Sequence, residues 1–133
     1  MITISRHIVE EMIKHAKEEY PWECCGMLAG KNQTVTKLFK TKNIAESKDL
    51  YELDPLDQVR AFEEIDRLNL QLLGVYHSHP DHPCYPSGLD TSQAFYPNTV
   101  FFIISLLEFD NPKIKAFKML KGREVVEEEI IFD

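Results

Sequence analysis

The sequence predicts a single α/β domain, spanning residues 1–133, in which a mixed β-sheet is packed against helices. Three observations lead to this prediction. The length of 133 residues suits one domain. The composition, 44% hydrophobic and 28% charged, is that of an ordinary globular protein. Segments with the 3.6-residue period of a helix also alternate along the chain with short apolar runs typical of strands.

Two long helices are indicated by capping residues that precede apolar periodicity. Ser5 can cap a helix that continues to about Tyr20. Asp54 can cap a second helix, because Pro55 fits the first helical position, where no amide donor is needed. The face of this second helix that is expected to be buried consists of Val59, Phe62, Ile65 and Leu68.

Short runs of apolar and β-branched residues between turn signals are predicted to be strands. They are Cys24–Ala29, Thr34–Thr41, Leu50–Leu53, Leu72–His79, Val100–Leu107, Ile114–Leu120 and Glu124–Phe132. The first two are expected to form a hairpin.

Charge, cysteine content and hydropathy exclude several classes of function. The net charge of −7 argues against a nucleic-acid partner, which needs a concentrated basic face. Cys24, Cys25 and Cys84 form an odd set with two adjacent members, which indicates a reducing compartment rather than a disulfide framework. No stretch approaches the roughly 18 to 20 apolar residues of a membrane span, and the N-terminus lacks a secretory signal. We therefore expect a soluble, cytoplasmic protein.

The segment His77-Ser78-His79-Pro80, followed by Ser87-Gly88-Leu89-Asp90, carries the clearest chemistry. Positions two apart in a strand point to the same face, so the two imidazoles are presented together. Asp90 can add a carboxylate from the first turn of a short helix that Ser87 caps and that runs through Ala94. Two nitrogens and one oxygen leave the fourth position of a zinc ion open, which is the catalytic pattern.

Each of these features also has an ordinary structural interpretation. The histidine pair can be a polar strand end, Asp90 a first-turn carboxylate that favours the helix dipole, and the segment from Ser87 a capping box. The joint pattern favours chemistry. His82 and Cys84, in the loop between these residues, can be extra ligands or loop packing, and we favour packing. At least one of Cys24 and Cys25 should face the core as a small hydrophobe.

The joint pattern resembles the signature of the JAMM (MPN-plus) zinc metallopeptidase family. That signature is an upstream glutamate, then His-x-His-Pro, then a ten-residue interval closed by Ser-x-x-Asp. Glu23 stands at the glutamate position, within a stretch from Pro21 to Gly30 that is also similar to the family. The resemblance covers the chain and implies a mixed, curved sheet of the MPN/JAB type, similar to the cytidine deaminase fold.

The resemblance also implies roles for individual residues. His77, His79 and Asp90 match the ligands of a Zn²⁺ cofactor. Glu23 matches the general base, and Ser87 matches a serine that stabilises the oxyanion. The implied activity is zinc-dependent hydrolysis of a peptide or isopeptide bond. Standalone prokaryotic members process ubiquitin-like proteins, including sulfur carriers that end in Gly-Gly, so such a tail is the expected partner and a sheet edge its expected binding place.

Three other interpretations compete with this one. A non-catalytic MPN scaffold would typically have lost ligands, and all are present here. A zinc-dependent deaminase needs a Pro-Cys-x-x-Cys element, but no second cysteine follows Pro83-Cys84. A relative of the RadC DNA-repair-associated proteins would carry a similar metal signature, but the acidic charge and the absence of a helix-turn-helix extension argue against it.

Overall fold

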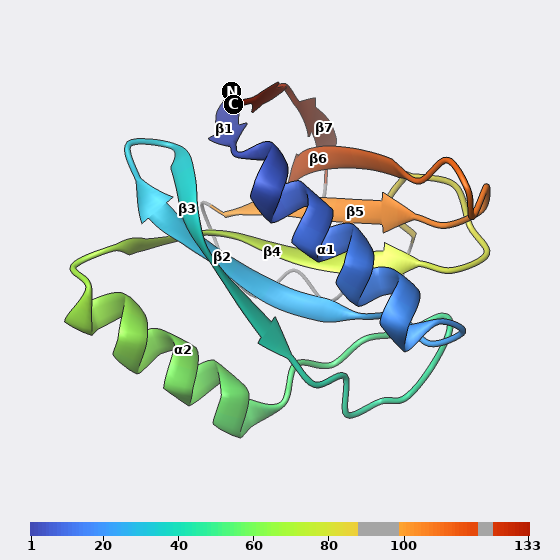
Figure 1. The fold of residues 1–133 in the computed structure, drawn as a ribbon, viewed down its shortest axis with the longest axis horizontal. Helices are drawn as coiled ribbons and strands as arrows, with labels where there is room; N and C mark the ends of the chain where they lie inside the picture. The colour runs from blue at the N-terminus through green and yellow to red at the C-terminus, as the bar shows by residue number, and fades with distance from the viewer. Residues whose placement is uncertain (88–98, 120–123) are drawn as a thin grey trace.

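The structure is a computed structural model that describes residues 1–87, 99–119 and 124–133. Within these ranges two helices and eight strands follow one another (Figure 1). In chain order they are β1 (Ile2–Ile4), α1 (Arg6–Glu19), β2 (Cys25–Lys31), β3 (Thr34–Thr41), α2 (Pro55–Arg67), β4 (Gln71–His79), β5 (Val100–Ser105), β6 (Lys113–Met119), β7 (Val125–Glu128) and β8 (Ile130–Phe132).

All eight strands belong to one mixed sheet with the order β7-β6-β5-β4-β2-β3-β1-β8. β4 lies near its middle, antiparallel to β2 and parallel to β5. β7 and β8 occupy opposite ends of this order, although only Glu129 separates them in the sequence. The sheet must therefore curve back on itself, and the first and last strands, β1 and β8, lie side by side in a parallel pair. This architecture confirms the predicted α/β class with a curved mixed sheet.

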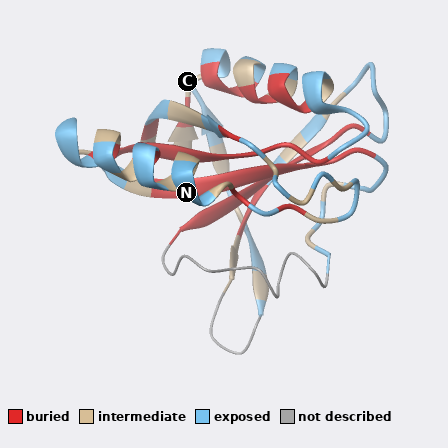
Figure 2. Cartoon of the chain, turned by 90° about the horizontal axis from the view of Figure 1, so that it is seen from below, coloured by how far each residue is buried: buried red, intermediate tan, exposed pale blue. Residues whose placement is uncertain are grey.

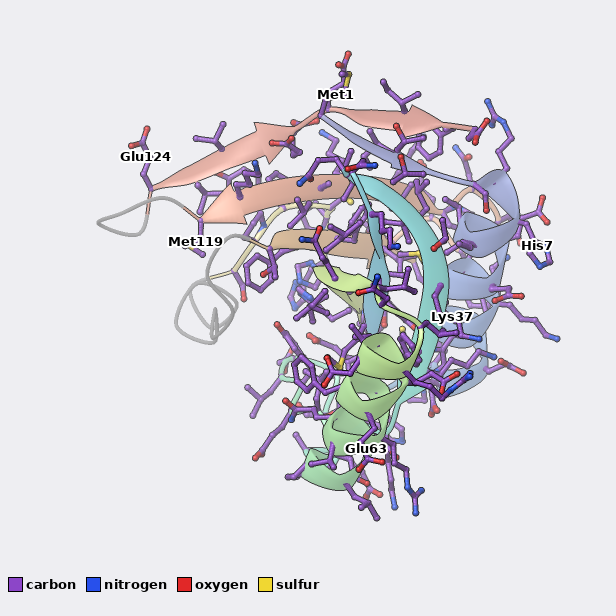
Figure 3. All side chains as sticks on the ribbon, turned by 90° about the vertical axis from the view of Figure 1, so that its left-hand side faces the viewer. Met1, His7, Lys37, Glu63, Met119 and Glu124 are labelled. Atoms are coloured by element: carbon purple, nitrogen blue, oxygen red, sulfur yellow. The ribbon has the colours of Figure 1, made fainter. Side chains whose placement is uncertain are left out.

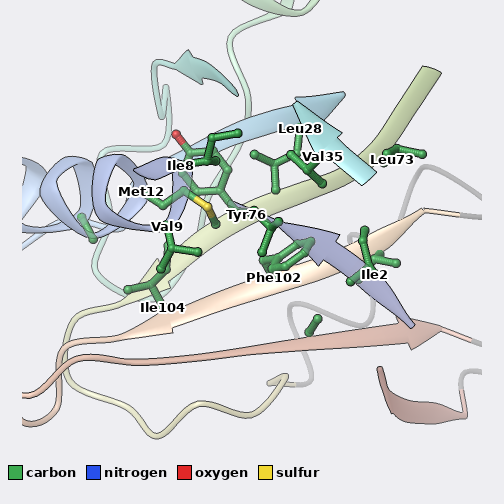
Figure 4. Close-up of a cluster of buried hydrophobic side chains, with 14 of the residues drawn as sticks. Ile2, Ile8, Val9, Met12, Leu28, Val35, Leu73, Tyr76, Phe102 and Ile104 are labelled. Carbon is green, nitrogen blue, oxygen red and sulfur yellow. The ribbon is translucent and has the colours of Figure 1, made fainter. Parts of the chain in front are cut away.

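The sheet buries a separate apolar cluster on each of its faces. The cluster under α1 includes Met12, Tyr76 and Phe102 (Figure 4). The cluster on the other face includes Val75 and Phe101 together with Ala61 of α2. Burial is accordingly concentrated in the strands between the two helices, whose outer faces are exposed (Figure 2). The side chains of His7 on α1 and Glu63 on α2 point away from the sheet (Figure 3).

Both predicted helix starts are confirmed by hydrogen bonds. The Ser5 hydroxyl accepts from the Ile8 amide at 3.2 Å, and the Asp54 carboxylate accepts from the Leu56 amide at 3.0 Å. No helix in the described ranges is long and apolar enough to span a bilayer.

The predicted buried stripe of α2 is partly wrong. Ala61 and Ile65 are the buried residues, whereas Val59 is 52% exposed. At 100° per residue Ala61 and Ile65 share one face of the helix and Val59 does not. The small alanine therefore takes the contact with the sheet that a larger residue was expected to make.

The strands of the structure differ from the prediction in three places. β1 was not anticipated, because three residues carry little periodicity. The predicted strand at Leu50–Leu53 is reduced to an isolated bridge between Leu53 and Asn43. The single strand expected at the C-terminal end is divided at Glu129 into β7 and β8. The short helix predicted after Ser87 lies outside the described residues.

Candidate active site

The end of β4 brings His77 and His79 together on one face of the sheet. Their side chains are buried, with 1% and 2% of the residue surface exposed. The two Nε2 atoms are 3.2 Å apart and the ring centroids 5.0 Å apart. The two-residue period of the strand produces this convergence, and pairing of β4 with β2 and β5 on either side fixes its position.

The tautomer of His79 follows from its second contact. Its Nδ1 atom lies 2.9 Å from the backbone carbonyl oxygen of Pro83. A carbonyl oxygen only accepts, so Nδ1 must carry the hydrogen and donate it. In the neutral ring Nε2 then presents its lone pair toward His77. A histidine held by a carbonyl through one nitrogen is the usual arrangement of a metal ligand.

His77 is held by an aromatic contact and by the strand beside it. Its ring stacks on Tyr51, with centroids 4.4 Å apart and an interplanar angle of 16°. Its cross-strand neighbour on β2 is Cys25. Tyr51 belongs to the connection between β3 and α2, so a loop far from the histidine motif in sequence forms one wall of the site.

Glu23 lies two residues before the start of β2 and is buried, with 2% of its surface exposed. The next residue ties this segment to the histidine strand. The Cys24 amide donates to the Ser78 hydroxyl at 2.8 Å, and the Ser78 amide donates to the Cys24 carbonyl at 3.1 Å. Glu23 is thereby fixed beside the residue that separates the two histidines. A buried carboxylate is costly unless it is compensated, so this glutamate is not an ordinary surface residue.

The other two predicted site residues are placed less fully. Asp90 falls in residues 88–98, outside the described part of the chain. Ser87 is described and is exposed, at the last described position after β4. Among the described residues no three histidine, cysteine or acidic side chains gather around one point as a metal site would require.

The described nitrogens fit a zinc ion. Two ligands at about 2.0 to 2.1 Å from a tetrahedral zinc ion are roughly 3.3 Å apart. The observed Nε2–Nε2 separation of 3.2 Å matches this value. Without a cation or a shared proton, two lone-pair-bearing nitrogens at that distance repel each other. The donor set therefore suits Zn²⁺ with one further carboxylate ligand.

The cysteines are protonated thiols rather than reactive groups, and Cys24 and Cys25 are buried while Cys84 is half-buried. Cys24 and Cys25 belong to the clusters on opposite faces of the sheet. Burial raises the pKa of the Cys25 thiol to about 12 and that of Cys24 further still. Cys84 donates to the Ile103 carbonyl at 3.0 Å, and burial raises its pKa to about 11. Protonated thiols are poor nucleophiles and poor ligands, which accords with the packing interpretation.

His82 is close to the site but faces outward. Its Nε2 atom pairs with the Asp49 carboxylate at 3.1 Å, and both side chains are more than half exposed. Its ring lies edge-on to that of His79, with the ring centroids 6.0 Å apart. Tyr51 and Asn43 were not predicted as site residues, because neither belongs to a recognisable motif. Ser78 lies within the histidine motif but was assigned no role there.

Comparison with known proteins agrees with this geometry. A family model described as prokaryotic homologs of the JAB domain matches residues 5–120. The chain belongs to this JAB family. The predicted membership of the JAMM/MPN family is therefore confirmed.

Curated relatives and solved structures extend the match. A desampylase from Haloferax volcanii is 37% identical over 103 residues, covering 72% of this chain and 74% of that protein. A probable TtuB-protein conjugate cleaving protease from Thermus thermophilus is 32% identical over 126 residues, covering 94% and 80%. The solution structure of a protein from Desulfitobacterium hafniense is 36% identical with a TM-score of 0.90, covering 100% of this JAB chain and 93% of its own.

Proposed function

We propose that this JAB protein is a zinc-dependent peptidase that cleaves peptide or isopeptide bonds after the Gly-Gly tail of ubiquitin-like or sulfur-carrier proteins in the cytoplasm. The convergence of His77 and His79 at 3.2 Å beside the buried Glu23 carries the proposal. The Thermus thermophilus relative is named for cleaving protein conjugates. The H. volcanii relative is named a desampylase.

Each proposed site residue has a separate role in the hydrolysis. His77, His79 and Asp90 would hold the zinc ion. Zinc bound there would polarise the scissile carbonyl and lower the pKa of water. Glu23 accepts a proton from the attacking water at its carboxylate and delivers it to the leaving amine. The Ser87 hydroxyl donates to the developing oxyanion, a contact typically worth about 2.7 to 4 kcal/mol of barrier.

The role of Glu23 is tested by replacing it with glutamine, which keeps its size but cannot accept the proton. General-base assistance is worth about 10²- to 10⁴-fold in rate. We expect Glu23→Gln to lose activity in that range while binding one zinc per chain, as measured by metal analysis and a cleavage assay. Cleavage at the wild-type rate would place the base elsewhere, and loss of zinc would make Glu23 a ligand.

The substrate class is tested with ubiquitin-like fusions that end in Gly-Gly before a reporter peptide. Mass spectrometry should locate the cut directly after the second glycine. A matched fusion with Ala-Ala in that position should be cleaved far more slowly. Equal cleavage of both fusions would contradict the proposed specificity but not the peptidase activity. A zinc-free protein that cleaves neither fusion would instead be the non-catalytic MPN scaffold.

A further inference from the structure

The side chain of Asn43 uses its full hydrogen-bonding capacity. Its Nδ2 atom donates to the carbonyl of Glu23 at 3.0 Å and to that of Leu50 at 3.1 Å. Its Oδ1 atom accepts from the amides of Ala45 at 3.0 Å and Glu52 at 2.9 Å. An amide side chain has two donors and two acceptor sites, so every one of them is satisfied by the backbone.

These bonds organise residues 43–53, which we call the Asn43 loop. The loop is closed at its base by the bridge between Asn43 and Leu53. It meets the candidate active site at three places. Its Ser47 carbonyl accepts from the Glu23 amide at 2.7 Å. Its Tyr51 stacks on His77, and its Asp49 pairs with His82. One polar side chain therefore supports a loop that touches the proposed base and a proposed ligand.

Glu23 depends on this loop because it lies outside the strand ladder. β2 begins at Cys25, two residues later. Two backbone contacts of Glu23 run to the loop: its amide donates to the Ser47 carbonyl, and its carbonyl accepts from the Asn43 side chain. A backbone shift at Glu23 would move its carboxylate with it. A misplacement of about 1 Å can cost roughly 10²-fold in rate.

We propose that Asn43 is a positioning residue for the hydrolysis, fixing the backbone of Glu23 so that its carboxylate faces the reacting water. This inference rests on the proposed function of Glu23 as the base. Asn43 acts through the Glu23 carbonyl and through the loop that binds the Glu23 amide. Its effect should fall on kcat rather than on substrate binding.

Two substitutions separate positioning from general support of the loop. Asn43→Ala removes all four bonds. Asn43→Asp keeps the acceptor that serves Ala45 and Glu52 but turns the donors into an oxygen, which repels the Glu23 and Leu50 carbonyls. We expect both variants to lose about 10- to 100-fold in kcat, normalised to zinc-loaded protein, with KM changed less than about threefold.

A second readout needs neither metal nor substrate. In the metal-free protein, NMR-detected amide exchange should accelerate at Glu23 in both variants. Exchange at Ala45 and Glu52 should accelerate in Asn43→Ala and stay protected in Asn43→Asp. Ser5→Ala is the matched control, because it removes a cap bond at the far end of α1. It should leave exchange at Glu23 and kcat unchanged.

The outcomes separate this inference from the proposed function. Unchanged exchange at Glu23 in both variants would overturn the positioning role, as would full kcat in Asn43→Asp or an equal kcat loss in Ser5→Ala. Wild-type cleavage by Glu23→Gln would instead refute the base itself. Accelerated exchange in the Asn43 variants would then still show the contact, but the contact would have no catalytic role.

Discussion

Tyr76 and His77 are neighbours on β4, and each is part of a buried histidine contact on one of the two faces of the sheet. On the α1 face, the Tyr76 hydroxyl is 2.8 Å from Nδ1 of His15, which is 5% exposed. On the other face, His77 and His79 are equally buried but direct their Nε2 atoms at each other. The histidines on the two faces are thus all buried, but the partners of their ring nitrogens differ.

That difference decides which histidines can carry chemistry. A hydroxyl can donate to or accept from His15, so the pair is complete within the protein. Burial lowers the pKa of His15 to about 4, helped by the charge of Lys40, and so favours the neutral ring. The other pair brings two Nε2 atoms within 3.2 Å of each other, an arrangement that suits a shared cation or a shared proton. A buried histidine is therefore informative only when its nitrogens are followed to their partners.

The largest expected effect comes from removing a histidine of the converging pair. His77→Ala should lose bound zinc and all measurable cleavage, because the remaining ligands cannot complete the site. His15→Ala should still bind one zinc per chain. Metal analysis beside a cleavage assay compares the two directly. If His77→Ala retained stoichiometric zinc, the metal would be held elsewhere.

The reverse comparison concerns stability. His15→Ala leaves the buried Tyr76 hydroxyl without its partner, which typically costs about 1 to 3 kcal/mol of unfolding free energy. Urea unfolding of the metal-free proteins should show this loss. His77→Ala, which removes a stacked ring rather than the partner of a buried hydroxyl, is measured beside it. An unchanged midpoint for His15→Ala would mean that the His15–Tyr76 bond contributes little.

The pH dependence of stability should sharpen the contrast. His15 has a folded pKa of about 4, below the ordinary value of 6.5, so the unfolded chain binds more protons between these values. Its contribution to stability is complete above about pH 6.5 and decreases as the pH falls toward 4, by at most about 1.4 kcal/mol per pH unit. The difference between wild type and His15→Gln isolates this term. A difference that does not vary with pH would show an unperturbed histidine.

The smallest effect is expected at Cys84. A serine can still donate to the Ile103 carbonyl, so Cys84→Ser should keep most of the activity and its zinc affinity. A competition titration against a zinc chelator measures this. A large loss of affinity would make Cys84 a ligand and would contradict its packing role.

Local signals predicted much of the fold. The caps at Ser5 and Asp54 are formed within three residues of each helix start, so the sequence alone could reveal them. β1 could not be found in this way, because its three residues are ordered by pairing with β3 and β8 at distant positions. The division of the last strand at Glu129 likewise depends on closure of the whole sheet.

The candidate site shows the same limit. The spacing of His77 and His79 in a strand was enough to predict that their imidazoles converge. Glu23 was visible only through the family resemblance, because its backbone is held by the Asn43 loop some 20 residues away in sequence. No role was predicted for His15, because the sequence of a helix does not reveal which distant residue, here Tyr76, its side chain contacts.

The position of β1 between β3 and β8 has a consequence for how the protein folds. Ile2 pairs with Ile130, and Ile4 with Phe132, so this ladder cannot form until nearly all the chain has been synthesised. The β2–β3 hairpin can form earlier, because its strands are joined by a short turn. Contacts between such distant positions slow folding, because a long chain must be ordered before they form. We infer that closing the sheet is a late step in folding.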